Sequence, residues 1–183
     1  MWAVRAGRTL NARSFMPDSK THKYVSITAG LGLSAYQAKE QTGLNFWVEV
    51  LGGGVGAWST GNLPDIFEPA ISSWHRSTFH SLTAGGAIVS QAAKLSAFTN
   101  FCREQAVQCK ANPKRIFMWP LGDGVFFPME LNDSLGKVLS TIEELLWIFL
   151  GGFANGAAAG YISHLALDGL TGKRSIPLLT KGF

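Results

Sequence analysis

Apolar residues fall into four stretches that are long enough to form helices, with polar or turn-forming segments between them. The stretches cover residues 22–39, 44–60, 77–101 and 140–170. The second stretch ends before GNLPD, where glycine, asparagine and proline predict a turn. This pattern predicts an all-α fold with about four main helices.

Short polar residues mark where two of these helices begin. Ser77 and Thr78 are both favourable N-cap residues for the third helix. Ser140, with two glutamates behind it, resembles a capping box for the fourth. Between these helices, residues 102–139 contain several prolines and the sequence LGDG, which predict an irregular segment. Its aromatic residues make it too apolar for a solvated linker, so we expect an interfacial loop.

The composition indicates a membrane protein rather than a soluble helical domain. The chain has 183 residues, of which 46% are hydrophobic and only 15% charged, and it contains 21 glycines. Ordinary soluble domains are about 25% charged, and glycine lets helices approach closely in lipid. Residues 145–163 carry no charge and approach the ~20 residues that a spanning helix needs. We therefore expect a small multi-pass membrane bundle, whose number of spans and topology stay open because the other helices carry ionisable residues.

Positive charge is concentrated at the beginning of the chain. The net charge is +4, and residues 1–23 account for all of it. A basic arm before an apolar segment is typical of a membrane flank, and no basic groove with interleaved aromatic residues follows that would indicate nucleic-acid binding. We expect residues 1–20 to form a basic N-terminal arm and residues 21–180 a single helical domain. Residues 1–15 lack the apolar region of a signal peptide, and a translation start at Met16 is an alternative.

All four histidines lie at predicted helix ends, next to small polar or acidic residues. His164 and Asp168 are four residues apart, so their side chains lie on one face of a helix and can bind one metal ion. Asp168 is costly in an apolar helix unless it is paired. Further candidates at predicted helix ends are His22, Asp65, Glu68, His75, Arg76 and His80. One layer of the bundle could bring these residues together around a metal ion.

Other patterns in the sequence have simpler interpretations. Glycines recur every four residues at positions 152–160, before His164, and predict a face against which another helix packs closely. The alternative for this segment is a packing face that ends in an ordinary histidine. Cys102 and Cys109 lack the short spacing of zinc motifs, so we expect two unpaired thiols, one of them packed. No nucleophile elbow of a serine hydrolase surrounds the serines next to histidines.

The blocks THKY, LPDIFEP, HRSTFHSL and GYISHLALDGLT…IPLL resemble the YdjM-like family. Its members are described as metal-dependent hydrolases of the bacterial inner membrane, and also as LexA-binding proteins. The resemblance covers about residues 21–179 and is weakest in residues 99–140. One position departs from the family pattern, because the family often has a second acid where this chain has Phe67. Glu68 is the acid that could take its place.

The resemblance implies a membrane-bound hydrolase that uses a metal-activated water molecule. The implied metal ligands are His22, Asp65, His80, His164 and Asp168. His75 or Glu68 would accept a proton or orient a ligand, and Arg76 would contact an anionic group. The ligand order is also similar to part of that in secreted zinc phospholipases C. A second downstream histidine cluster is absent from this sequence, so we expect one or two ions, zinc or manganese. We expect Asp65 within the cluster and His22 at its edge.

A membrane position favours a lipid or another amphiphile as the substrate, with a phosphoester as one candidate. The alternative is a non-enzymatic membrane scaffold or partner-binding protein, in which the same residues hold a structural metal or form a polar network. A catalytic zinc site keeps an open coordination position, whereas a structural site does not. The sequence leaves both interpretations open.

Overall fold

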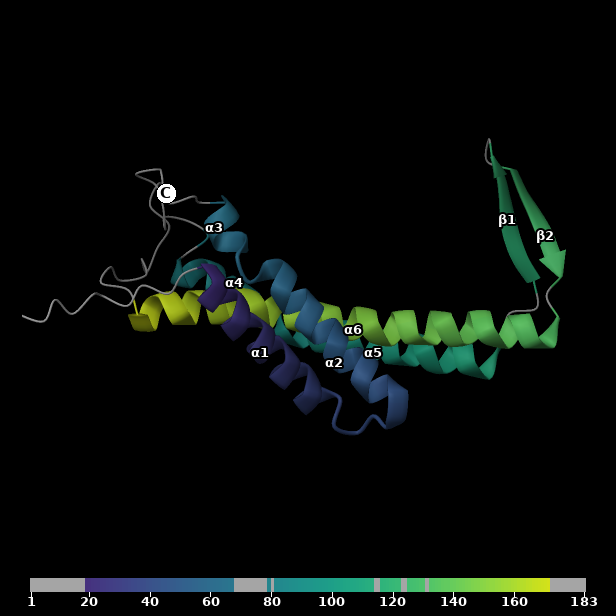
Figure 1. Cartoon of the computed structure of the whole chain (residues 1–183), viewed down its shortest axis with the longest axis horizontal. Coiled ribbons are helices and arrows are strands. Elements are labelled where there is room, and N and C mark those ends of the chain that lie inside the picture. The colour runs from purple at the N-terminus through teal and green to yellow at the C-terminus, as the bar shows by residue number, and fades with distance from the viewer. Residues whose placement is uncertain are drawn as a thin grey trace, which may run out of the picture.

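The structure, a computed structural model, describes residues 19–67, 79, 81–113, 116–122, 125–130 and 132–171, with the two strands described by their backbone. Along these residues lie α1 (Ser19–Gln37), α2 (Gly43–Thr60), α3 (Leu63–Phe67), α4 (Leu82–Ser90), α5 (Ala92–Ala111), β1 (Ile116–Gly122), β2 (Val125–Glu130) and α6 (Asp133–Thr171). The helices form one bundle along α6, and the hairpin stands beside the first turns of α6 (Figure 1). The expected helical fold is therefore confirmed, with a β-hairpin added to it. The predicted basic arm lies almost wholly outside the described residues.

The helices α2 and α6 pack backbone against backbone along two rows of glycine. A Cβ atom at Gly152, Gly156 or Gly160 of α6 would collide with backbone atoms of α2, and one at Gly52 or Gly56 of α2 would collide with the backbone of α6. Successive glycines of α6 meet successive turns of α2, so the two helices run parallel. Small residues permit this close approach and the backbone contacts that come with it. The close-packing face predicted at residues 152–160 is confirmed.

The helices α1 and α5 also lie along α6 and run antiparallel to it (Figure 1). Ser26, near the start of α1, donates a hydrogen bond to the carbonyl oxygen of Gly160, near the end of α6, over 3.1 Å. In α5, Thr99 accepts a hydrogen bond from Asn155 over 2.9 Å. As a result, the beginnings of α1 and α4 and the ends of α2 and α6 gather at one end of the bundle.

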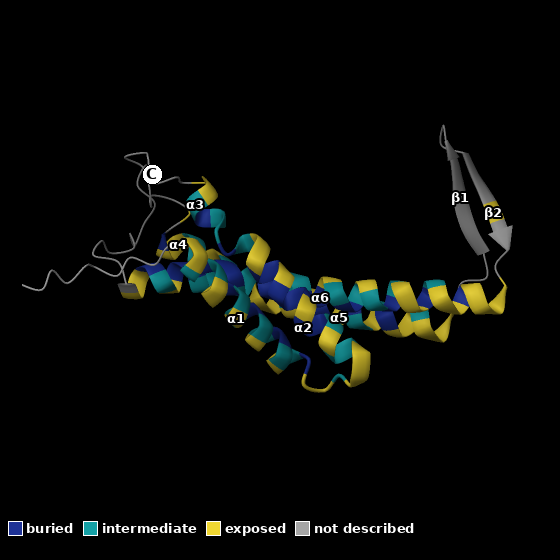
Figure 2. Cartoon of the chain, in the orientation of Figure 1, coloured by how far each residue is buried: buried dark blue, intermediate teal, exposed yellow. Residues whose placement is uncertain are grey.

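Polar and small side chains fill the interior of the bundle, and large apolar side chains cover its outside. The buried residues of α1 are His22, Ser26, Gly30 and Ser34. The exposed large apolar residues of α2 are Leu44, Trp47, Leu51, Val55 and Trp58, and those of α6 include Val138, Ile142, Leu146 and Leu150. Figure 2 shows the buried residues where the helices meet and the exposed ones on the outer faces. Val50, Ile148, Tyr161 and Leu165 are buried as well, so the unusual feature is the number of large apolar residues left exposed. Among the helices in the described part of the chain, α6 is the one long and apolar enough to cross a membrane.

Glu49, in the middle of α2, is fully buried and paired with Arg103 of α5. Its carboxylate accepts hydrogen bonds from Nη2 and Nε of Arg103, over 2.5 and 3.2 Å. Nη2 of Arg103 also donates to the carbonyl oxygen of Gln37 at the end of α1, over 2.8 Å. The pair therefore connects three helices. Removing one member of such a buried pair typically costs about 3–5 kcal/mol, because the other charge is left uncompensated.

The predicted third helix is wrong at both ends. The helix begins at Leu82 and its N-cap is Ser81, whose side chain accepts a hydrogen bond from the backbone N–H of Ala84 over 3.1 Å; Ser77 and Thr78, the expected caps, lie outside the described residues. The helix is interrupted at Gln91, which divides it into α4 and α5. The helix α5 then continues to Ala111, because its Glu, Gln, Lys and Ala residues are strong helix formers. Cys102 is buried and Cys109 half-buried on α5, and neither forms a disulfide, as expected.

The irregular loop predicted for residues 102–139 is also wrong. After α5, β1 and β2 pair antiparallel, with Pro120 opposite Phe126 and Pro128 opposite Met118. Each strand of a two-stranded sheet has one edge outside the ladder, which tolerates proline.

The helix α6 begins at Asp133, seven residues before the predicted start at Ser140. Asn132 caps it, since its side-chain oxygen accepts a hydrogen bond from the N–H of Leu135 over 2.8 Å. Ser140 is a buried residue within the helix, so the capping box predicted there is wrong.

Replacing Gly156 with alanine should destabilise the bundle, because the added Cβ would collide with the backbone of Gly53. Overpacking of this kind typically costs about 1–3 kcal/mol. Gly32→Ala is the matched control, since a Cβ there meets nothing within 4 Å and alanine should gain ~0.5–1 kcal/mol over glycine in a helix. Thermal melting should give a lower Tm for Gly156→Ala alone. Equal Tm values for the two variants would contradict the close packing.

Candidate metal centre

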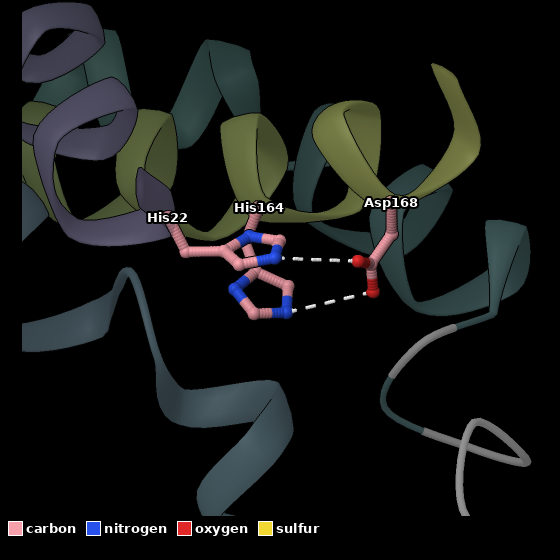
Figure 3. Close-up of side chains that lie close together, drawn as sticks. All are labelled: His22, His164 and Asp168. Atoms are coloured by element: carbon pink, nitrogen blue, oxygen red, sulfur yellow. Dashed lines mark ion pairs between the residues drawn. The ribbon is translucent and has the colours of Figure 1, made fainter. Parts of the chain in front are cut away.

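Two imidazoles and two carboxylates meet where α1 begins, where α6 ends, and at the short helix α3. Nε2 of His22 lies 3.4 Å from Oδ1 of Asp168, and Nε2 of His164 lies 3.7 Å from its Oδ2. Nε2 of His164 also lies 3.6 Å from Oδ1 of Asp65. The two imidazole rings are stacked, with centroids 4.1 Å apart. Figure 3 shows Asp168 with one oxygen facing each ring. The structure therefore brings four of the predicted ligands together.

Three of these side chains are buried and one is partly exposed. His22, His164 and Asp168 have exposed fractions of 4%, 0% and 3%, whereas the side chain of Asp65 is 39% exposed. Asp65 therefore forms the open edge of the cluster, and the expectation that His22 lies at the edge is wrong. The reason is that the small residues of α1 let its first turn approach α6 closely, while α3 is only five residues long.

The end of α2 determines the orientation of His164. Nδ1 of His164 lies 2.6 Å from the carbonyl oxygen of Gly61, the C-cap residue of α2. Because a carbonyl oxygen can only accept a hydrogen bond, we infer that Nδ1 carries a proton and donates it. In the neutral ring the lone pair is then on Nε2, the atom that faces Asp65 and Asp168. Such a backbone hydrogen bond commonly selects the metal-binding nitrogen of a histidine.

Hydrogen bonds next to the cluster connect α1 and α6, which carry three of its four residues, and also connect α6 with α2. Ser163 donates to Ser26 or to the carbonyl oxygen of Gly160, over 3.0 and 2.9 Å. Thr60 of α2 donates to the carbonyl oxygen of Ala157 of α6, over 2.7 Å. Ser26, Thr60 and the carbonyl of Gly61 were not predicted from the sequence. One signal was available for Ser26, which follows His22 by four residues and so lies on the same face of α1.

The charges and distances of the cluster suit a divalent cation. Two carboxylates and two neutral imidazoles carry a total charge of −2, which a divalent ion would balance. Zinc bonds of about 2.0–2.2 Å in tetrahedral geometry separate two ligand atoms by about 3.4 Å, close to the 3.4, 3.6 and 3.7 Å between the nitrogen and oxygen atoms here. One ligand atom each from His22, His164 and Asp168 lies within 4.8 Å of the other two. These three residues could therefore hold a metal ion.

The remaining predicted site residues lie outside the described residues, and these are Glu68, His75, Arg76 and His80. Phe67 and Phe79 flank residues 68–78, the segment that contains Glu68, His75 and Arg76. Their rings are stacked with centroids 4.9 Å apart. Tyr161 of α6 donates a hydrogen bond to the carbonyl oxygen of Phe79 over 2.5 Å. The chain therefore enters and leaves this segment beside the end of α6.

Comparisons with protein-family models, with curated proteins and with solved structures find no match to this chain. Its function is therefore inferred from the geometry of the cluster and from the sequence blocks that contain its residues.

Replacing Asp168 with asparagine should abolish tight metal binding and leave the fold intact, because the side chain keeps its shape and loses its charge. Loss of even an indirect partner of a metal ligand typically costs 10–100-fold in affinity, so we expect a loss of about 100-fold or more. Asp133→Asn, on the first turn of the same helix, is the matched control. Metal-stripped proteins should melt alike, and added zinc should raise the Tm of wild type and Asp133→Asn alone. Equal zinc affinity for Asp168→Asn and wild type would remove Asp168 from the ligand set.

Proposed function

We propose that this protein is a membrane-bound, metal-dependent hydrolase. The observation that carries the proposal is the convergence of His22, His164 and Asp168, buried and within ligand distance of one another. Their order in the chain is that of the blocks that resemble the YdjM-like family, and the proposal includes membership of that family. One or two ions of zinc or manganese are the proposed cofactor.

A metal ion in this position would lower the pKa of a bound water molecule from about 15.7 towards 7 and polarise the bond to be cleaved. Asp168, with one oxygen towards each imidazole, would be the central ligand. The partly exposed Asp65 leaves the cluster accessible from one side, as a catalytic site requires. His75 or Glu68 as proton acceptor, Arg76 as anion contact and His80 as a further ligand are proposals from the sequence alone.

The proposed location is the bacterial inner membrane, with several helices crossing it; contact with lipid is the part of this proposal to which the distribution of side chains is relevant. The exposed faces of α2 and α6 are covered by large apolar residues, which water would not favour over such an area. Most buried residues are small or polar, and the one buried carboxylate in the middle of α2 is paired with Arg103. Buried, paired charges and glycine contacts between helices are typical of proteins in lipid.

An amphiphilic substrate is supported by the surroundings of the cluster. Large apolar side chains next to the ligand residues in the sequence are exposed, and they are Ile66, Phe67 and Leu170. Phe79 and Leu82, beside the N-cap of α4, are exposed as well. An apolar rim around a polar site suits a molecule with a hydrocarbon tail and a polar group. A lipid, or a phosphoester with such a tail, is therefore the proposed substrate class.

The alternative is a non-enzymatic scaffold or partner-binding protein with a structural metal. The observation that favours it is the near-complete burial of three of the four ligands. The two proposals differ in whether a water molecule occupies one coordination position, and hydrolysis distinguishes them.

The protein should fractionate with membranes and stay there after washing with concentrated salt, because its attachment would depend on apolar surface rather than on charge. Detergent should release it. The measurement is immunoblotting of membrane and soluble fractions, with a peripheral membrane protein as the control for the wash. Recovery as a monodisperse protein without detergent would rule out the membrane bundle.

The purified protein should hydrolyse a phosphoester or carboxylic ester of an amphiphile in detergent micelles, and only with zinc or manganese present. His164→Ala and Asp168→Asn should reduce the rate at least 100-fold, because each removes a ligand. Asp133→Asn should keep the wild-type rate. Release of the product is measured across a panel of lipid esters. Metal binding without hydrolysis of any substrate, in a panel that includes both ester classes, would favour the scaffold.

A further inference from the structure

A second polar site lies at the opposite end of the bundle from the metal cluster. It is a pocket of about 290 Å³ between α2, α5 and α6, and its polar lining residues are Gln41, Asn45, Arg103, Lys110 and Glu144. Small-molecule sites typically begin at about 300 Å³, so its size suits a small group. Glu144 and His164 are separated by about 30 Å along α6 at 1.5 Å per residue.

The lining of this pocket is rich in hydrogen-bond donors. Arg103 uses Nε and Nη2 to bond Glu49 and Gln37, so both N–H bonds of Nη1 have no partner among the residues that the structure describes. The side chain of Lys110 is 75% exposed, and its Nζ lies 3.9 Å from Glu144, beyond hydrogen-bond distance.

The one carboxylate in the lining already has a donor. Oε1 of Glu144 accepts a hydrogen bond from Nδ2 of Asn45 over 2.9 Å. The other Nδ2 hydrogen of Asn45 and the side-chain amide of Gln41 have no partner among the described residues. Arg103 is paired with Glu49, and Lys110 lies near Glu144. The two cations are therefore matched by two carboxylates, and the excess in this pocket is of N–H donors without acceptors among the described residues.

The first turn of α2 adds to this arrangement. Asn45 belongs to that turn, and the N-cap residue Thr42 makes no side-chain hydrogen bond to it. The amino-terminal end of a helix has a partial positive charge and N–H groups without partners in the helix, which favour an anion nearby. The unpartnered N–H donors and the helix end therefore favour the same kind of ligand, one that offers several acceptor oxygens.

We propose that this pocket binds a phosphate group, either of a phospholipid headgroup or as free phosphate. Arg103 and Lys110 contact the phosphate oxygens, and Gln41 and Asn45 donate from the side of α2. Arginine and lysine are the usual protein partners of phosphate. A phospholipid as the source of the phosphate group rests on the proposed membrane position. The distance between the pocket and the metal cluster matches the thickness of the hydrocarbon core of a bilayer, about 30 Å. The pocket would then lie among the headgroups of the opposite leaflet.

The test uses the full chain as its Asp168→Asn variant, purified in a maltoside detergent and stripped of metal, so that phosphate cannot bind at a metal ion. Inorganic phosphate is titrated in one arm, and phosphatidylglycerol in mixed micelles in the other, each followed by calorimetry and thermal melting. Lys110→Gln should weaken binding about tenfold or more, because it removes a charge-assisted hydrogen bond to the phosphate, and the side chain it changes is 75% exposed. Lys94→Gln, an exposed lysine on the same helix, is the matched control and should bind like the parent. Arg103 is left intact because its loss would leave Glu49 buried without its partner.

Binding of phosphatidylglycerol alone identifies a lipid headgroup site, and binding of inorganic phosphate alone identifies a site for the free ion. Either result, with the loss in Lys110→Gln, supports the proposal. The proposal is overturned when neither ligand binds, or when Lys110→Gln binds as tightly as the parent. Zinc binding by wild-type protein from the same preparation is measured in parallel, so that a failure of the metal centre is seen separately from a failure of this pocket.

Discussion

Backbone contact between α2 and α6 leaves no room for a side chain at the glycines along their interface. Because the helices are this close, side chains at the end of one can reach backbone atoms of the other. Two contacts depend on this short distance between the helices. The carbonyl oxygen of Gly61 contacts His164, and Thr60 contacts the carbonyl oxygen of Ala157. The same closeness lets the serine-rich face of α1 lie against both helices. The positions of the described side chains in the cluster therefore depend on the glycines of this interface.

Local sequence patterns predicted the parts of the structure that local chemistry determines. The HxxxD spacing placed His164 and Asp168 on one helix face, and the four-residue spacing of the glycines predicted a packing face. Asp65 was expected in the cluster and lies 3.6 Å from His164. Burial was predicted less well, since nothing in the sequence showed that α1 would approach α6 more closely than α3 does. His22 therefore lies at the centre of the cluster and Asp65 at its edge, the reverse of the expected arrangement.

The boundary errors have a common physical cause. Ser77, Thr78 and Ser81 are all competent N-caps by residue type, so local sequence does not choose among them, and α4 is capped by Ser81. The hairpin was missed because prolines usually argue against strands, and only an outer edge makes them acceptable. The pairing of Glu49 with Arg103 joins residues far apart in the sequence and was not predicted.

The hydrogen bond from His164 to Gly61 has a thermodynamic consequence. The acceptor belongs to the end of α2, whereas the imidazole belongs to α6. A cation bound at Nε2 requires the tautomer with its proton on Nδ1, and the bond to Gly61 stabilises that tautomer, so the cation would favour the arrangement in which the two helices are docked. Linkage is reciprocal, because free energy depends only on the end states. If a bound cation stabilises the docking of α2 on α6 by a certain free energy, docking increases the affinity for the cation by the same free energy. The ion and the interhelical interface are therefore each other's effectors.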